Sequence, residues 1–133
     1  MSRIVLDPSS LIAYLKAEPE APRLEAAMLK ASVLSMSAAS LVEAGMVAER
    51  LRGGGGSADL DMLLVQMNVS IVPFTEQQAE LARTAFRRFG KGRHPAGLNF
   101  SDCFSYALAR ALGEPLLFVR NDFSQTDVQV ATY

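Results

Sequence analysis

Residues 3–16 read RIVLDPSSLIAYLK, and this stretch decides how the chain begins to fold. Residues Arg3–Leu6 form a short apolar run with two β-branched side chains, which is typical of a buried strand. Asp7 and Pro8 end that run, since Asp is a favoured N-cap and Pro is tolerated at the first helical position. Apolar residues then recur at helical spacing, at Leu11, Ile12 and Leu15. The stretch therefore predicts a strand that leads directly into a helix, with Asp7 at the junction.

The rest of the chain repeats this alternation of short strands and helices. Further strands are expected at 33–36, 69–74 and 116–119, and a fifth strand is left open at 128–132. Helices are expected at 23–31, 37–52, 58–67 with Ser57 as its cap, 75–89 and 101–112. This order predicts an α/β fold in one domain, 1–133, with a mainly parallel sheet of four or five strands flanked by helices.

A run of four glycines occupies positions 53–56. Such a run stops the preceding helix and predicts a plain, mobile linker. No Lys-Ser/Thr pair follows it, so the run lacks the sequence of a Walker-type phosphate loop.

The composition is that of a soluble domain without a strong overall charge. Half of the 133 residues are apolar, yet no apolar run approaches the ~20 residues that span a membrane, and no signal-peptide pattern is present. A lone cysteine, Cys103, fits a reducing compartment, so a cytoplasmic protein is expected. The net charge is −1, from 13 basic and 14 acidic residues. Proteins that bind nucleic acid mainly through phosphates usually carry a basic excess, so any such attraction here must be local or come from a metal or a partner.

Four acidic residues from distant parts of the chain are expected at one edge of the sheet. Asp7 directly follows the first strand, and Asp122 closely follows the fourth. Glu43 and Asp102 fall in the opening turns of helices. In an open parallel sheet, the ligand crevice lies beyond the carboxyl ends of the strands. Carboxylates that converge there are suitable ligands for a hard cation.

Each acid also has a structural interpretation, and spacing alone leaves both interpretations open. Asp7 fits an N-cap, and Glu43 stands three residues after Ser40, as in a capping box. The helix dipole favours Asp102 in a first turn, and Asp122 fits a residue that shapes a turn.

One basic concentration leads directly towards Asp102, formed by Arg87, Arg88, Lys91, Arg93 and His94. It fits a local phosphate-binding patch, and it fits equally a solvated helix end with cations near the C-terminus. His94 is the only histidine, which argues against a zinc site. Ser9, two residues after Asp7, is a candidate to steady a carboxylate or a metal-bound water.

Four ordered segments carry the most specific pattern in the chain. They are IVLDPSSLIAYLKAEPEA (4–21), SMSAASLVEAGMVAERL (35–51), ELARTAFRRFGKGRHPAGLNFSDCFSYALAR (80–110) and GEPLLFVRNDFSQTDV (113–128). Together they cover nearly the entire sequence. In this arrangement the chain resembles the PIN-domain ribonucleases and, within them, the VapC-type toxins of bacterial toxin–antitoxin pairs.

That resemblance implies a PIN-like fold and a Mg²⁺-dependent endoribonuclease, with Mn²⁺ as a possible substitute. It implies four catalytic acids, namely Asp7, Glu43, Asp102 and, as the best match to the fourth, Asp122. Family members vary most around the last position, so Asn121 and Asp127 remain alternative contributors. Asp7 and Asp102 are expected as the main metal ligands, and the sequence leaves open whether one or two ions act.

The resemblance also implies a substrate and partners. A metal-activated water is expected to cleave RNA in single-stranded or looped segments, with tRNA among the candidate targets. A cognate antitoxin is expected to cover the catalytic groove. A homodimer is expected as well, with toxin–antitoxin hetero-oligomers when the antitoxin is present, and no membrane partner.

The sequence departs from the usual family pattern at two places. The first motif commonly reads Asp-Thr-Ser-Ala, but here Pro8 stands at the position of the Thr. Near the last acid, Val119 and Arg120 replace a more usual Lys-Gly. These departures leave a second hypothesis open: a catalytically weak PIN-like module that binds RNA or a partner protein.

Overall fold

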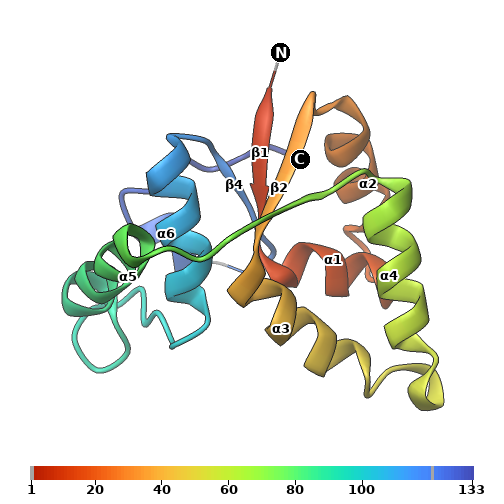
Figure 1. Ribbon diagram of the computed structural model, residues 1–133, viewed down its shortest axis with the longest axis horizontal. Coiled ribbons are helices and arrows are strands. Elements are labelled where there is room, and N and C mark those ends of the chain that lie inside the picture. The colour runs from red at the N-terminus through yellow and green to blue at the C-terminus, as the bar shows by residue number, and fades with distance from the viewer. Residues whose placement is uncertain (1, 121) are drawn as a thin grey trace.

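The computed structural model describes residues 2–120 and 122–133, and for Asp122 it describes the backbone only. Within this part of the chain, four parallel strands form one sheet in the order β3-β2-β1-β4 (Figure 1). The strands are β1 (Arg3–Leu6), β2 (Val33–Ser37), β3 (Ser70–Val72) and β4 (Leu116–Leu117). Because β1 lies between β2 and β4, the residue that follows it stands in the middle of one sheet edge.

Helices cover both faces of this sheet. They are α1 (Pro8–Leu15), α2 (Ala21–Lys30), α3 (Ala38–Ala48), α4 (Gly56–Gln66), α5 (Glu76–Phe89) and α6 (Asp102–Leu112), with short 3₁₀ turns η1 (Arg52–Gly54) and η2 (Asp122–Gln125). Figure 1 shows α1 to α4 on one side of the sheet and α5 and α6 on the other. Among the described residues, no helix is long and apolar enough to cross a membrane.

The central strand β1 divides the core into two halves. Successive side chains of a strand point to opposite faces, and Ile4 and Leu6 therefore pack into the apolar cluster beneath α1 to α4. Val5 points the other way, into the cluster formed with α5 and α6. Leu117 and Leu116 of β4 are divided between the two clusters in the same manner. The three-layer arrangement thus follows from buried strands that are apolar on both faces.

The register of the strands brings their carboxyl ends to a common edge. Val5 pairs with Ser35 of β2, and Leu6 pairs with Leu117 of β4. The backbone N–H of Asp7 then donates to the carbonyl oxygen of Leu117, at 3.0 Å. The loops that follow β1 and β4 are therefore neighbours, although they are more than a hundred residues apart in sequence.

The predicted α/β fold is confirmed, but 128–132 is not a strand. It meets the sheet in a single bridge between Leu116 and Val130, with the Ala131 N–H donating to the Leu116 carbonyl at 2.9 Å. Because β4 is only two residues long, it has too few backbone groups for 128–132 to form a longer hydrogen-bonded ladder with it. The strand expected at 69–74 is also shorter than predicted and ends at Val72, since Pro73 has no N–H to extend the ladder.

The glycine run is not the plain linker that the sequence predicted. Gly56 is buried and is the first residue of α4, while Gly55 occupies the N-cap, so the prediction of Ser57 as the cap is wrong. A Cβ on Gly56 would lie only 2.3 Å from the carbonyl oxygen of Ala48. Glycine is therefore required there to bring the start of α4 against the end of α3.

Candidate active site

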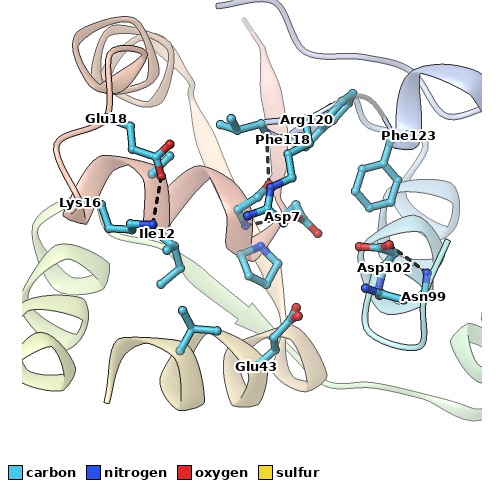
Figure 2. A pocket seen from close by; sticks show the side chains of 15 residues that line it. Asp7, Ile12, Lys16, Glu18, Glu43, Asn99, Asp102, Phe118, Arg120 and Phe123 are labelled. Carbon is cyan, nitrogen blue, oxygen red and sulfur yellow. Dashed lines mark hydrogen bonds and ion pairs between the residues drawn. The ribbon is translucent and has the colours of Figure 1, made fainter. Parts of the chain in front are cut away.

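A cleft of about 150 Å³ opens at the carboxyl edge of the sheet. The acids that line it include Asp7 after β1, Glu43 from α3 and Asp102 at the start of α6, and Glu18, which pairs with Lys16, lines it after the end of α1. Figure 2 shows the first three carboxylates turned toward the same space, with Arg120 reaching over Asp7 from the loop after β4. The predicted convergence of these acids thus occurs in the fold.

Asp7 is both an N-cap and the most enclosed acid of the cleft. Its side chain is 5% exposed. One carboxylate oxygen, Oδ2, accepts a hydrogen bond from the Ser9 N–H at 3.0 Å, which caps α1 as expected. The other, Oδ1, accepts from the Ser105 hydroxyl at 2.6 Å. Burial raises the pKa of this carboxyl, and the hydrogen bonds from Ser105 and Ser9 oppose the rise. The structural and the functional interpretations of Asp7 are therefore compatible.

Ser9 connects the two loops that carry the site. Its hydroxyl oxygen accepts a hydrogen bond from the backbone N–H of Val119 at 3.0 Å. This bond fixes the chain just before Arg120 against the first turn of α1. Ser9 therefore positions the loop after β4 and also donates its backbone N–H to the Asp7 carboxylate that caps α1.

Glu43 lies in the second turn of α3 and is half-buried. Its carboxylate accepts a hydrogen bond from the Ser101 hydroxyl at 2.6 Å. Burial raises the pKa of Glu43, the charge of Asp7 raises it further, and Ser101 and Arg120 oppose the rise. The capping-box interpretation is wrong, because Ser37 and not Ser40 is the N-cap of α3. The Glu43 carboxylate is thus directed into the cleft rather than to the helix end.

Asp102 opens α6 and forms a reciprocal pair with Asn99. The Asp102 carboxylate accepts from the Asn99 N–H at 3.0 Å, and the Asn99 side-chain oxygen accepts from the Asp102 N–H at 2.9 Å. Both residues line the cleft. The pair fixes the start of α6, which also carries Ser105 one turn further along.

The region of the expected fourth acid is only partly described. Asp122 is the first residue of η2, but its side chain and the whole of Asn121 lie outside the described residues. Asp127 is directed elsewhere: it accepts from the Tyr106 hydroxyl at 2.6 Å and pairs with Arg88 at 3.2 Å and Arg110 at 3.5 Å. Asp127 thus ties the C-terminal segment to α5 and α6 and does not line the cleft.

Among the described residues, the cations that line the cleft are Lys16 and Arg120, and none comes from the basic segment at 87–94. In that segment, Arg87 donates to the Thr84 hydroxyl and Arg88 pairs with Asp127. Lys16 was not predicted from the sequence as a site residue, although its spacing from Pro8 could have indicated it. Pro8, Ile12 and Lys16 are spaced four residues apart and therefore share one face of α1, and all three line the cleft.

The donor set suits a hard divalent cation. In the part of the chain that the structure describes, no three acidic, His or Cys side chains are gathered tightly enough to enclose a metal ion by themselves. Mg²⁺ does not require such a cage, since it usually binds one or two carboxylates and keeps several waters. Two desolvated carboxyls with raised pKa values also repel each other, and a cation would relieve that repulsion.

Comparison with known proteins places the chain in a family. The profile of the PIN domain matches residues 4–129, and the chain therefore belongs to the PIN-domain family. Its curated relatives include VapC ribonucleases. It is 46% identical over 125 residues to "Ribonuclease VapC30" of Mycobacterium tuberculosis, covering 94% of this chain and 95% of the relative. It is 48% identical to "Ribonuclease VapC" of Mycolicibacterium smegmatis, covering 94% and 97%. The resemblance stated from the sequence, including ribonuclease as the enzyme class, is confirmed.

Solved structures share the fold at low sequence identity. Mycobacterium tuberculosis VapC20, described as a sarcin-ricin loop cleaving toxin, aligns with a TM-score of 0.76 at 22% identity over 94% of this chain and 95% of that one. A toxin–antitoxin complex from Klebsiella pneumoniae aligns with a TM-score of 0.74 at 18% identity, covering 98% of both chains. These alignments confirm the PIN-like α/β fold.

Proposed function

We propose that this protein is the toxin of a type II toxin–antitoxin pair and acts as a Mg²⁺-dependent endoribonuclease, with Mn²⁺ as a substitute. The observation that carries the proposal is the convergence of Asp7, Glu43 and Asp102, from three separate elements, on one cleft. A purely structural role would not need these three carboxylates to face one another, because mutual repulsion and burial disfavour their charged forms.

Asp7 and Asp102 would hold the cation from opposite sides of the cleft. Ser105 fixes the orientation of the Asp7 carboxylate, and the Asn99 pair fixes that of Asp102. When bound, the divalent ion would lower the pKa of a water molecule and stabilise charge on the scissile phosphate. In this proposal Asp122 contributes a fourth carboxylate from the segment after β4. Whether one or two ions bind depends on whether that carboxylate joins the other three.

Glu43 has the properties of a proton acceptor. Burial raises its pKa towards the pH at which the enzyme works, and general bases are most effective when these two values are close. The Ser101 hydroxyl holds one carboxylate oxygen, at 2.6 Å, and so fixes the orientation of the other. Glu43 would accept a proton from the attacking water as the new P–O bond forms. The bond to the leaving oxygen would then break, solvent water would protonate that oxygen, and Glu43 would return its own proton to solvent.

The substrate is proposed to be RNA in a single-stranded or looped segment, tRNA included. Unpaired segments can turn their backbone into a confined cleft, whereas a duplex is recognised mainly from outside by its shape. Lys16 and Arg120 supply positive charge at this cleft, and the basic segment at 87–94 is retained as a more distant phosphate-binding candidate. Because the net charge of the protein is −1, its overall field does not attract RNA, and positive side chains at the cleft must do so.

A cognate antitoxin is proposed to cover the cleft, with a homodimer as the unit of assembly in the cytoplasm. Large apolar side chains that are exposed on α3 and α4 support binding to another protein chain, namely Val42, Met46, Met62 and Val65. Val42 and Met46 are four residues apart on α3, and Met62 and Val65 are three residues apart on α4, so each pair lies on one exposed helix face that another chain could cover.

The experiment is RNA cleavage by purified protein freed of antitoxin. Cleavage is expected with Mg²⁺ or Mn²⁺ and should stop when EDTA is added. Cleavage that continues at the same rate in EDTA would contradict the proposal.

A second candidate is a PIN-like module that binds RNA or a partner with little catalysis. The position of Arg120 inside the acidic cleft favours it, because a guanidinium there can replace the cation. Calorimetry separates the two functions: an active site must bind Mn²⁺ through Asp102, whereas a module need not. Binding that is absent in both the wild type and Asp102→Asn would favour the module.

A further inference from the structure

Arg120 stands among the acids in a backbone conformation that an L-amino acid rarely adopts. Its φ is +99°, in the region that glycine favours. The hydrogen bond from the Val119 N–H to the Ser9 hydroxyl holds the chain in place just before it. A side chain kept at such a position at the expense of backbone strain points to a function for that side chain.

The direction of the Arg120 side chain suggests what that function is. Figure 2 shows it extending from the loop after β4 toward Asp7, on the side of the cleft that Glu43 also faces. Its charge acts on both of these carboxyls and favours their ionised forms. Of the other charged groups at the cleft, Asp102 lies on the wall formed by α6, and Lys16 pairs with Glu18 at 3.6 Å.

Asp7 and Glu43 accept hydrogen bonds from neutral groups: Ser9 and Ser105 donate to Asp7, and Ser101 donates to Glu43. Such neutral donors reduce the cost of burying the charge but do not neutralise it. The positive charge of Arg120 at the cleft opposes the negative charge of both carboxylates without any bound ion. A divalent cation would have to interact with the same two carboxylates.

We propose that the Arg120 guanidinium is a tethered counter-cation that stabilises Asp7 and Glu43 in the metal-free protein and competes with the divalent ion for them. The proposal rests on the proposed function, since it takes the acidic cleft to be the metal site. In this proposal the Arg120 side chain must leave the two carboxylates before a divalent ion can bind them. Arg120 therefore lowers the metal affinity of the site and partly blocks it until the metal binds.

The test is calorimetric titration of the full-length protein with Mn²⁺ alone, without RNA, at low ionic strength. Arg120→Gln removes the charge and keeps the unfavourable φ, whereas Arg120→Gly removes the charge and also relieves the backbone. Both variants should bind Mn²⁺ about fivefold more tightly than the wild type. Arg120→Lys should stay near the wild type because it keeps the charge.

Two controls make the result specific. Arg83→Gln changes the net charge by the same amount on the exposed face of α5, where Arg83 pairs with Glu80, and should leave the Mn²⁺ affinity unchanged. Because Arg120 is exposed to solvent, the difference between Arg120→Gln and the wild type should shrink as salt is raised to about 0.5 M. Far-ultraviolet circular dichroism verifies that each variant is folded.

The outcomes separate this inference from the proposed function. Mn²⁺ binding that depends on Asp7 but is equal in the wild type, Arg120→Gln and Arg120→Gly would overturn the inference alone. Absence of Mn²⁺ binding in all of these proteins would overturn both. Unchanged Mn²⁺ affinity together with weaker binding of Arg120→Gln to an uncleavable RNA would make Arg120 a phosphate ligand, which also overturns the inference.

Discussion

The hydroxyl of Ser105 donates a 2.6 Å hydrogen bond to the carboxylate of Asp7, 98 residues away in the sequence. This bond joins the end of β1 to the inner face of α6, and both partners are buried. It fixes the orientation of the acid that the fold encloses most completely among the carboxylates of the cleft. The geometry of the site therefore depends on how α6 packs against the sheet.

Ser105→Ala should weaken the site without removing any acid. The Asp7 carboxylate would lose a charge-assisted hydrogen bond, which is worth about 1.5–3 kcal/mol in the buried state. We expect a loss of that order in the free energy of unfolding at pH 7, measured by urea denaturation, and weaker Mn²⁺ binding. Unchanged stability and unchanged Mn²⁺ affinity would show that the bond does not position Asp7.

Asp7→Asn should stabilise the metal-free protein at neutral pH. Because burial raises the pKa of Asp7, the folded state holds its proton more tightly than the unfolded state does. The wild type therefore loses stability as the pH rises from the ordinary carboxyl pKa through the raised one. Asn removes the charge and can still cap α1.

The measurement is thermal unfolding in EDTA across a pH series. Asp7→Asn should melt above the wild type at pH 7, and the gap should narrow as the pH falls to about 4. Added Mn²⁺ should raise the melting temperature of the wild type and leave that of Asp7→Asn unchanged. A variant that melts below the wild type at every pH would contradict this account of Asp7.

Gly56→Ala should destabilise the protein because its new Cβ would meet the Ala48 carbonyl at 2.3 Å. A forced overlap with backbone typically costs about 1–3 kcal/mol. Gly45→Ala is the matched control: it lies inside α3 with nothing within 4 Å of the new Cβ, so it should gain up to about 1 kcal/mol. Chemical denaturation of both variants measures the difference, and equal stabilities would contradict the tight contact.

Tyr106→Phe should reduce stability but not cleavage. Its hydroxyl donates to Asp127 outside the cleft, and burial together with Asp127 raises the pKa of Tyr106 to about 12. Loss of this bond should cost about 1–2 kcal/mol of unfolding free energy. RNA cleavage at a temperature where the variant is folded should match the wild type, and a large loss would place this network in the active site.

The sequence predicted what depends on local pattern. The junction at Asp7, the start of the helix at 75–89 and the end of the helix at 101–112 follow from residues close together in the chain. In the structure Thr75 is the N-cap of α5, and Gly113, whose φ is +66°, is the C-cap of α6. The sequence also predicted that Asp7, Glu43 and Asp102 would share an edge, because parallel strands end on the same side.

It did not predict what depends on packing between distant elements. Ser105 lies within α6 and Ser101 is its N-cap, and the sequence distinguishes neither. They become donors to Asp7 and Glu43 because α6 lies beside β1 and α3. The role of Gly56 likewise depends on how closely α4 approaches α3. Arg120 was visible in the sequence as a departure from the family pattern, but its place in the cleft depends on the bond between Val119 and Ser9.

The central claim is that the acidic cleft cleaves RNA, and Asp7→Asn tests it most directly. The measurement is the initial rate of RNA cleavage by antitoxin-free protein in saturating Mg²⁺, with the variant verified as folded. Loss of a group that holds the metal should lower the rate about 100-fold or more. A variant that cleaves as fast as the wild type would show that the cleft formed by Asp7, Glu43 and Asp102 is not the active site.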